Sequence, residues 1–407
     1  MPSSESRAAK IERFFAERYG REALFVPSGR LALLLAFKTW LRAGDRILMS
    51  PVTDDVVFFL VLAAGLRPVI GPLDPSTGNL DFRAVPAALW SGLQGVLTTN
   101  LYGIPDDMEH LHDCCERSGT VQIEDACHAL DTRLAGKRIG CFGAAAAFSL
   151  AKHLKVAGGI LIFADANQRA GLVAMARGFL EPRRLLASLT WLTRPYAVES
   201  VEALHLGAQA LRVRSALGLA RTGHGGHRMP YEIDHVRTAR AEPDFLLGFR
   251  RWLDMDHAAW RMPPPDLYLG TILDRLDRLD ENLARRRAGQ RELRESGLAP
   301  ILTGLPEDTA LFRVPLFVND RERARSACAR RGLPVNYIYD PPLDIYAHPS
   351  LVECLPSPPA ALAWSREVLP VDPLSAGRFL SAMGGPITPR PQGGNDLRTE
   401  FNYNAVS

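Results

Sequence analysis

The stretch Val121-Gln-Ile-Glu-Asp-Ala-Cys-His128 predicts a short strand that ends in acidic residues and a histidine. In open sheets of parallel strands, ligands bind beyond the carboxyl ends of the strands. A carboxylate at that point, here Asp125, lacks a charge partner unless a cation comes to it. Asp125 is therefore either a ligand-binding group or an ordinary helix cap or surface acid, and the strand alone favours neither.

Similar β-rich runs occur on both sides of this strand. Together with residues 120–123, they occupy 23–26, 46–49, 68–70, 95–99, 145–150 and 159–163. Helical segments lie between several of them, at 29–43, 55–65, 82–90 and 106–118. The alternation of strands and helices predicts an α/β fold with a mostly parallel, seven-stranded sheet covered on both faces. The nearly continuous apolar strands fit burial on both sides.

The chain changes character after residue 165. From 166 to 262 strand signals are sparse and Arg is frequent, so we expect a divergent helical insertion. Apolar residues at helical spacing then predict one long helix over 266–295, after a run of three prolines. A strand at 310–317, a helix at 321–331, a strand at 335–339, a helix at 360–366 and a strand that ends at Val371 follow. We therefore predict a large domain, 1–262, and a small C-terminal α+β domain, 263–407.

Composition narrows the classes of partner. The 48 basic and 45 acidic residues give a net charge of +3, so we expect neither nucleic acid nor a membrane as partner. The longest apolar run, 56–66, is too short to span a bilayer, and the N-terminus lacks the apolar core of a secretory signal. Six cysteines without a C-x-x-C pair are typical of reduced thiols in a cytoplasmic protein. His224 and His227 have no evident third ligand, so we expect no metal site.

A second stretch that could carry catalytic residues is Phe148-Ser-Leu-Ala-Lys-His-Leu-Lys-Val-Ala-Gly-Gly159. It runs from a strand, through a polar segment with two lysines, to a glycine pair that permits close backbone approach. A lysine that forms a Schiff base must lie near an aldehyde and lose its proton readily, which partial burial favours. Pyridoxal 5'-phosphate is such an aldehyde, and its protonated ring nitrogen needs a carboxylate such as Asp125. Lys152 and Lys155 could equally be solvated loop residues.

The third stretch is Val26-Pro-Ser-Gly-Arg-Leu-Ala32, in which a strand is followed by Ser-Gly and a helix. A helix N-terminus offers free N–H groups and the positive end of the helix dipole, which suits a phosphate. Ser28, Gly29 and Arg30 lie at that point. Ser-Gly before a helix is also ordinary capping.

Together, these segments resemble the DegT/DnrJ/EryC1/StrS family of sugar aminotransferases. Asn100-Leu-Tyr-Gly-Ile-Pro-Asp-Asp-Met108 is similar to the family's HLYG-x-PADM, and Glu124-Asp-Ala-Cys-His128 to its EDAAQ or EDAAH. Gly136-Lys-Arg-Ile-Gly-Cys-Phe-Gly143 is similar to its GKKVGSFGD. The similarity covers about residues 20–375 and is strongest over 95–163.

The resemblance implies the pyridoxal-phosphate-dependent transferase fold type I, and a homodimer with shared active sites. It implies that Asp125 binds the pyridinium and that His128 lies beside the phenolic oxygen of the cofactor. Lys152 falls at the position of the family's Schiff-base lysine, with Lys155 as the alternative. The residues expected at the phosphate are Ser28, Gly29, Arg30 and Ser149.

Some positions depart from the family. No aromatic residue follows Pro51, where the family has one that stacks on the cofactor ring. Thr53 or Asp54 would face the ring instead, or Phe58 or Tyr102 would substitute for the aromatic residue. Ala259-Trp260 precede Arg261-Met262, where the family often has an Asn that reaches the partner subunit's phosphate. We expect Tyr102 and Tyr337 to contact a substrate that differs from that of the family's best-known members.

The resemblance implies an aminotransferase that moves an amino group from glutamate or glutamine to a keto group of a sugar or related intermediate. Lys152 would act as acid and base between its covalent roles. One alternative is a sugar dehydratase, whose relatives have histidine in place of the lysine. The lysine here, followed by His153, argues against it. A second alternative is a catalytically degenerate homologue that binds a ligand, and a third is an unrelated α/β protein.

Overall fold

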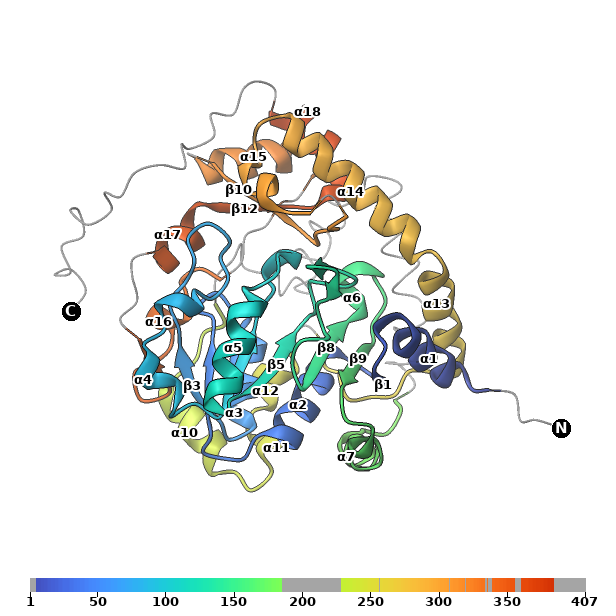
Figure 1. Cartoon of the computed structure of the whole chain (residues 1–407), viewed down its shortest axis with the longest axis vertical. Helices are drawn as coiled ribbons and strands as arrows, with labels where there is room; N and C mark the ends of the chain where they lie inside the picture. The colour runs from blue at the N-terminus through green and yellow to red at the C-terminus, as the bar shows by residue number, and fades with distance from the viewer. Residues whose placement is uncertain are drawn as a thin grey trace.

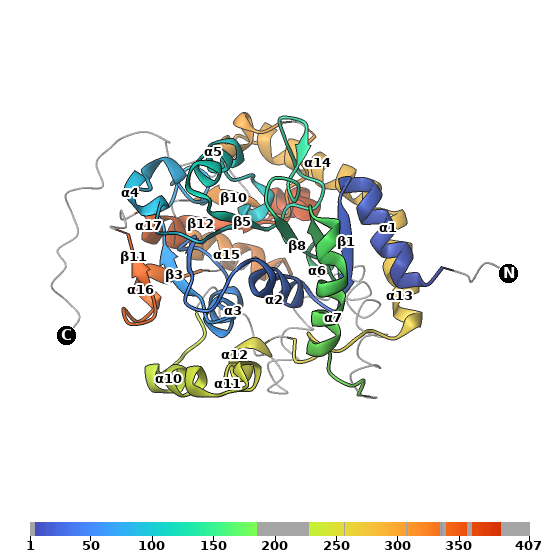
Figure 2. The same ribbon diagram turned by 60° about the horizontal axis from the view of Figure 1, so that its bottom comes forward.

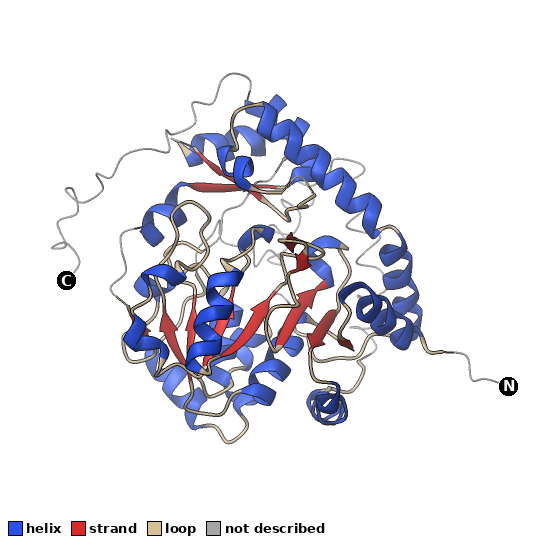
Figure 3. Cartoon of the chain, viewed as in Figure 1, coloured by secondary structure: helices blue, strands red, loops and turns tan. Residues whose placement is uncertain are grey.

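The computed structural model describes residues 5–184 and 228–383, apart from 256, 307, 319, 334, 336–338 and 356–359. Its centre is an eight-stranded sheet with helices on both faces, and a two-stranded sheet with its own helices lies at one end (Figure 1). Figure 3 shows the same division by secondary structure, with the large sheet below the small one. The predicted Tyr337, and the histidines at 224 and 227, lie outside the described residues.

The large sheet has the strand order β1-β9-β8-β5-β4-β2-β3-β11. Only β9 runs antiparallel to its neighbours, and the other pairs are parallel. All seven predicted strands form, and β11 adds an eighth, because two residues from near the end of the described chain pair with β3. The strands are β1 (Glu22–Val26), β2 (Arg46–Met49), β3 (Arg67–Ile70), β4 (Gly95–Thr98), β5 (Val121–Asp125), β8 (Ala145–Ser149), β9 (Gly159–Phe163) and β11 (Glu353–Cys354).

Helices cover both faces of this sheet (Figure 2). Alternate residues of each strand enter two different cores, which is why the strands are apolar almost throughout. One face packs against α2 (Gly29–Trp40) and α3 (Asp55–Ala63). The other packs against α1 (Arg7–Tyr19) and α5 (Met108–Ser118). The predicted helix 82–90 is a 3₁₀ turn, Phe82–Ala84, followed by α4 (Ala87–Trp90).

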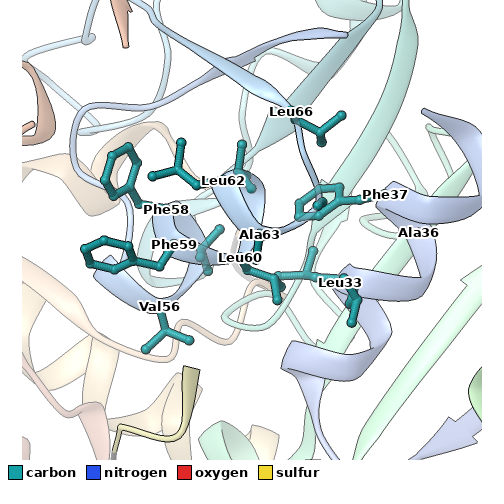
Figure 4. Close-up of a cluster of buried hydrophobic side chains, with 14 of the residues drawn as sticks. Leu33, Ala36, Phe37, Val56, Phe58, Phe59, Leu60, Leu62, Ala63 and Leu66 are labelled. Carbon is teal, nitrogen blue, oxygen red and sulfur yellow. The ribbon is translucent and has the colours of Figure 1, made fainter. Parts of the chain in front are cut away.

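The helix α3 is apolar on every side because it is covered on every side. Short helices from a distant part of the sequence lie over its outer face, and Phe59 of α3 stacks on Trp252 with ring centroids 4.7 Å apart. Figure 4 shows Phe58 and Phe59 in this core, with Leu33 and Phe37 contributed by α2. A helix without a polar face is expected where no face meets water. The covering helices are α10 (Ile233–Ala241), α11 (Phe245–Gly248) and α12 (Arg250–Leu253).

The long helix predicted over 266–295 is in fact two helices, α13 (Asp266–Asp277) and α14 (Leu279–Glu295). Arg278 between them has φ −101° and ψ 10°, outside the helical region. The two helices pack against different partners: α13 against α1, and α14 against α18 (Ala376–Met383). Because of the break at Arg278, the apolar side of α13 packs against the large-sheet part of the molecule and that of α14 against the small-sheet part.

The second sheet pairs β10 (Val314–Phe317) with β12 (Val368–Val371) in antiparallel register. Its own core includes Leu293, Leu316 and Phe379, all fully buried. The chain between its strands returns to the large sheet, where it forms α16 and β11. The division into domains after residue 262 stays a prediction. Other elements are α6 (Leu150–His153), α7 (Arg169–Phe179), α15 (Arg321–Arg330), α16 (Leu343–Tyr346) and α17 (Ala360–Glu367). Among the described residues, no helix is both long and apolar enough to cross a membrane.

Candidate functional site

The three motifs that the sequence singles out meet at one edge of the large sheet. Asp125 ends β5, Ser149 ends β8, and Gly29 begins α2. A Cβ atom on Gly29 would lie 3.1 Å from Cβ of Ser149 and 3.2 Å from Sγ of Cys127. The N-terminus of α2 therefore lies directly against the ends of both strands, as ligand sites of parallel sheets require.

The glycine pair before β9 makes this arrangement possible. A Cβ atom on Gly159 would lie 2.2 Å from the carbonyl carbon and oxygen of Ser28. No side chain fits at that distance, so only glycine lets β9 begin against the start of α2. The expectation of close backbone approach at this pair is confirmed.

Asp125 is held in place by its neighbours. Its Oδ1 accepts a hydrogen bond from the backbone N–H of Cys127, at 3.1 Å, and its carbonyl accepts one from Nδ2 of Asn100, at 3.3 Å. Burial raises the pKa of Asp125, while the hydrogen bonds to Cys127 and the charge of Lys152 oppose this rise. A carboxylate in such surroundings is stabilised by a cation placed against it.

Of the two candidate lysines, Lys152 is the one within electrostatic range of the predicted site. Its charge acts on the pKa of both Asp125 and His128, and its Nζ lies 5.8 Å from the ring centroid of Phe312. Lys155 lies three residues further along the chain, with φ +56°. The geometry therefore favours Lys152 as the reactive amine.

His128 is a neutral histidine with a defined tautomer. Its Nδ1 accepts a hydrogen bond from the backbone N–H of Tyr102, at 3.3 Å, which leaves the proton on Nε2. Burial, together with the charge of Lys152, holds the pKa of His128 well below its usual range. The imidazole stacks on Phe312, with centroids 4.9 Å apart, and on Tyr102, at 6.1 Å. His128 can thus donate one hydrogen bond from Nε2 without carrying charge.

The loop at Tyr102 joins the small sheet to this site. Gly103 has φ +97°, and a Cβ atom there would lie 2.8 Å from the carbonyl oxygen of His128 and 3.2 Å from the backbone nitrogen of Phe312. Tyr102 is only 1% exposed and packs among Val52, Tyr339 and Trp364. The ring of Tyr102 therefore packs against His128, and its contact with substrate stays a prediction.

The predicted phosphate residues divide into two kinds. Ser28 caps α2: its Oγ accepts from the N–H of Leu31 and donates to the carbonyl of Trp260, at 2.8 Å. Arg30 donates from Nη1 to the carbonyl of Leu253, at 2.7 Å. Both side chains thus bind the segment that covers α2, and Ser28 is also the N-cap of that helix. Ser149, which caps α6 without a side-chain hydrogen bond, leaves its hydroxyl for another partner.

Sequence reasoning missed Arg228. Its guanidinium is almost fully buried and donates to Asp55 Oδ1 and to the carbonyls of Pro51, Thr53 and Pro341, at 2.5–3.1 Å. It fixes the loop between β2 and α3 against the segment that precedes α16. No local pattern could have identified it, since its partners lie far away in the sequence.

The residues expected to face or stack on the cofactor ring have different surroundings. Phe58 is fully buried in the core beneath α3, against Phe59 and Tyr346, so it cannot face the site. Thr53 is 4% exposed, and its Oγ1 is buried without a hydrogen-bond partner among the residues that the structure describes. Asp54 is exposed and acts on the pKa of Asp125 and of the Tyr339 phenol.

These residues fit pyridoxal 5'-phosphate. A carboxylate for the ring nitrogen ends β5, a neutral histidine donor lies beside it, and an amine comes from the next strand end. A helix N-terminus and the hydroxyl of Ser149 lie together, as a phosphate requires. The unpartnered hydroxyl of Thr53 is a further group that a bound cofactor would satisfy. No cluster of three or more potential metal ligands occurs within the described part of the chain.

Comparison with solved structures identifies the fold. A DegT DnrJ EryC1 StrS aminotransferase from Brucella abortus superposes with a TM-score of 0.64 at 16% identity, over 93% of this chain and 90% of that one. Streptomyces venezuelae DesV, solved with a ketimine intermediate, gives 0.62 at 20% identity, over 93% and 88%. Escherichia coli GDP-4-keto-6-deoxy-D-mannose-3-dehydratase with hydrated PLP gives 0.65 at 15%, over 93% and 91%. The fold is that of the pyridoxal-phosphate-dependent transferases of fold type I, as predicted.

Comparison of sequences shows a similarity to one family over the first part of the chain. Residues 3–178 match the profile of the DegT/DnrJ/EryC1/StrS aminotransferase family. L-glutamine:2-deoxy-scyllo-inosose aminotransferase of Streptomyces kanamyceticus is 33% identical over 167 residues, 40% of this chain and 39% of that protein. A dTDP-3-amino-3,4,6-trideoxy-α-D-glucose transaminase of Streptomyces venezuelae is 35% identical over 130 residues, 31% and 34%. The chain matches less than half the length of these relatives.

Proposed function

We propose that the protein is a pyridoxal-phosphate-dependent aminotransferase that moves an amino group from glutamate or glutamine to a keto group of a sugar or related biosynthetic intermediate. The observation that carries this proposal is the position of Lys152, within electrostatic range of Asp125 and His128 at the ends of β5 and β8. The aminotransferases among its relatives support the reaction class.

Each residue has a defined task in this proposal. When bound, pyridoxal 5'-phosphate supplies an aldehyde that takes up an amino group and a ring that accepts electrons from the neighbouring C–H bond. Asp125 would stabilise the positive charge at the ring nitrogen, and His128 would donate from Nε2 to the phenolic oxygen. Lys152 would supply the amine that binds the cofactor and would act as the acid and base that moves the proton. Ser149 and the N–H groups of α2 would hold the phosphate.

The dehydratase alternative has a specific observation against it. Dehydratases occur among the relatives, and His153 directly follows Lys152. His153 is 1% exposed, and its Nε2 lies 3.0 Å from the carbonyl of His128. Burial lowers the pKa of His153 to about 3, so it stays neutral and donates this hydrogen bond. A histidine so placed supports His128 from behind and is not an available base.

The proposal is tested by adding pyridoxal 5'-phosphate to the purified protein, reducing with borohydride and mapping the labelled peptide. We expect the label on Lys152, and loss of the cofactor's absorbance band on addition of glutamate or glutamine. A label on Lys155 would correct the assignment of the amine and keep the function. Absence of any covalent adduct would refute the aminotransferase and favour a degenerate binding homologue.

We further propose that the protein is a homodimer with shared active sites. The support is the family resemblance, because enzymes of fold type I build their active sites at a dimer interface. Sedimentation equilibrium of the full chain checks this, since a monomer at micromolar concentration would contradict it.

A further inference from the structure

The residues Phe312 and Arg313 are carried into the candidate site from the small sheet. The backbone N–H groups of both donate to the carbonyl of Tyr102, at 2.8 and 3.2 Å. These bonds place the ring of Phe312 face to face with His128 and beneath the amine of Lys152. The strand that begins with Val314 thereby positions two side chains at the reacting end of the large sheet.

Three cations surround the ring of Phe312. Arg313 Cζ, Arg286 Cζ and Lys152 Nζ lie 4.4, 5.7 and 5.8 Å from its centroid. Both arginines pair with the same acid, Asp372. One carboxylate for two guanidinium groups leaves an excess positive charge on the small-sheet side of the site.

The two arginines are used very differently. Arg286 is 1% exposed, and its guanidinium donates hydrogen bonds to the carbonyls of Leu311 and Phe312 and to the side chains of Asn282 and Asp372. Arg313 is 30% exposed, and only its Nη1 is engaged, by Asp372 and the carbonyl of Phe312. Its Nε and Nη2 have no partner within the described part of the chain. Arg286 therefore supports the structure, while Arg313 keeps donors free.

Other arginines near the site lack this freedom. Arg228 donates to four oxygens and is buried, and Arg30 and Arg321 are engaged with backbone carbonyls and, in the case of Arg321, with Asp340. Arg313, by contrast, acts electrostatically on His128, Tyr102 and His153. It is thus a charged, partly exposed group that lies against Phe312 and within electrostatic range of His128.

We propose that Arg313 binds a carboxylate of the amino donor, an assignment that rests on the proposed function. The reacting carbon of an amino-acid donor must lie beside Lys152, and its carboxylate is one bond away from that carbon. A guanidinium fork with two free nitrogens matches a planar carboxylate. The single excess charge suits a monoanion better than the diphosphate of a nucleotide sugar. Asp372 and the ring of Phe312 orient the fork.

The test uses cofactor-free protein and glutarate, a dicarboxylate that cannot react, titrated in a calorimeter. We expect Arg313→Gln to weaken glutarate binding at least tenfold and Arg313→Lys to restore part of it. Arg323→Gln, an exposed arginine on α15, is the matched control and should change nothing. In the cofactor-loaded enzyme, Arg313→Gln should raise KM for glutamate far more than it lowers kcat.

Each other outcome overturns the assignment. Unchanged glutarate binding by folded Arg313→Gln, checked by circular dichroism, would show that the carboxylate binds elsewhere. Binding of pyrophosphate, rather than glutarate, that depends on Arg313 would assign the fork to a phosphate. Glutarate binding needs no cofactor. Failure of the borohydride experiment would therefore refute the proposed function, while the calorimetric result would still show whether Arg313 binds a carboxylate.

Discussion

Two regions of the molecule contribute to the candidate site in different ways. One consists of the strand ends within 121–159, and the other of the segments 228–262 and 311–313. The first region acts through neighbours in sequence: Asp125 is fixed by Cys127, and Lys152 lies three residues after Ser149. The second acts through distant contacts, such as Arg228 on Pro51 and Phe312 on His128. The local region supplies the chemistry, while the distant segments determine its position and surroundings.

The largest effect is expected from a substitution in the local region, at the predicted reactive lysine. Lys152→Ala should lower kcat/KM by about 10³-fold or more, because the proton transfer and the covalent step lose their amine. Lys155→Ala, three residues away, should stay within about tenfold. Steady-state kinetics with both variants checks this, and equal loss in the two would mean that the local region was assigned to the wrong lysine.

The distant segments should instead affect stability first. Arg228→Met leaves Asp55 buried without its cation, so we expect a loss of about 3–5 kcal/mol in the free energy of unfolding. Urea denaturation measures it. The control is Arg237→Met, which removes an exposed pair with Asp234 and should cost less than about 1 kcal/mol. A similar, small loss of stability for both variants would show that Arg228 does not hold the loop between β2 and α3.

Two glycines with positive φ test the contact between the two regions, because only one of them lies at that contact. Gly103 and Gly136 both have positive φ, but only Gly103 faces backbone within 3 Å. Alanine at either position adds about 1 kcal/mol of backbone strain, and Gly103→Ala should cost a further ~1–3 kcal/mol as loop 101–103 separates from Phe312. Thermal unfolding of the two variants gives the difference, and equal values would contradict the close approach.

The smallest effect concerns acid stability. Burial alone would raise the pKa of Asp372, but Arg313 and Arg286 hold it below its usual range. A carboxyl whose folded pKa is depressed stabilises the protein above its unfolded pKa, and this contribution is lost as pH falls through the folded pKa. Asp372→Asn should therefore flatten the decline of stability between about pH 4 and pH 2. Urea midpoints across this range test it, and an unchanged slope would contradict it.

The same comparison explains what the sequence could predict. The seven strands, Asp125 and the glycine pair were predictable because apolar runs and turn residues act over a few positions. The break at Arg278 was not, since it depends on α13 packing against α1 and α14 against α18. The burial of Tyr102 was not predictable for a related reason, since Val52, Tyr339 and Trp364, which bury it, lie in other parts of the chain. Phe312 and Arg228 have no local signal, because their partners lie in other parts of the chain.

The eighth strand has a consequence for solubility. Without β11, the apolar strand β3 would present a row of unpaired N–H and C=O groups at the rim of the sheet, where a second molecule could add a strand. The two residues of β11 occupy that row, and Glu353 pairs there with Arg46. A cover that is so short, exposed and charged is itself a poor template for further pairing. The returning segment thus protects the protein against edge-to-edge aggregation at the rim farthest from β1 and β9.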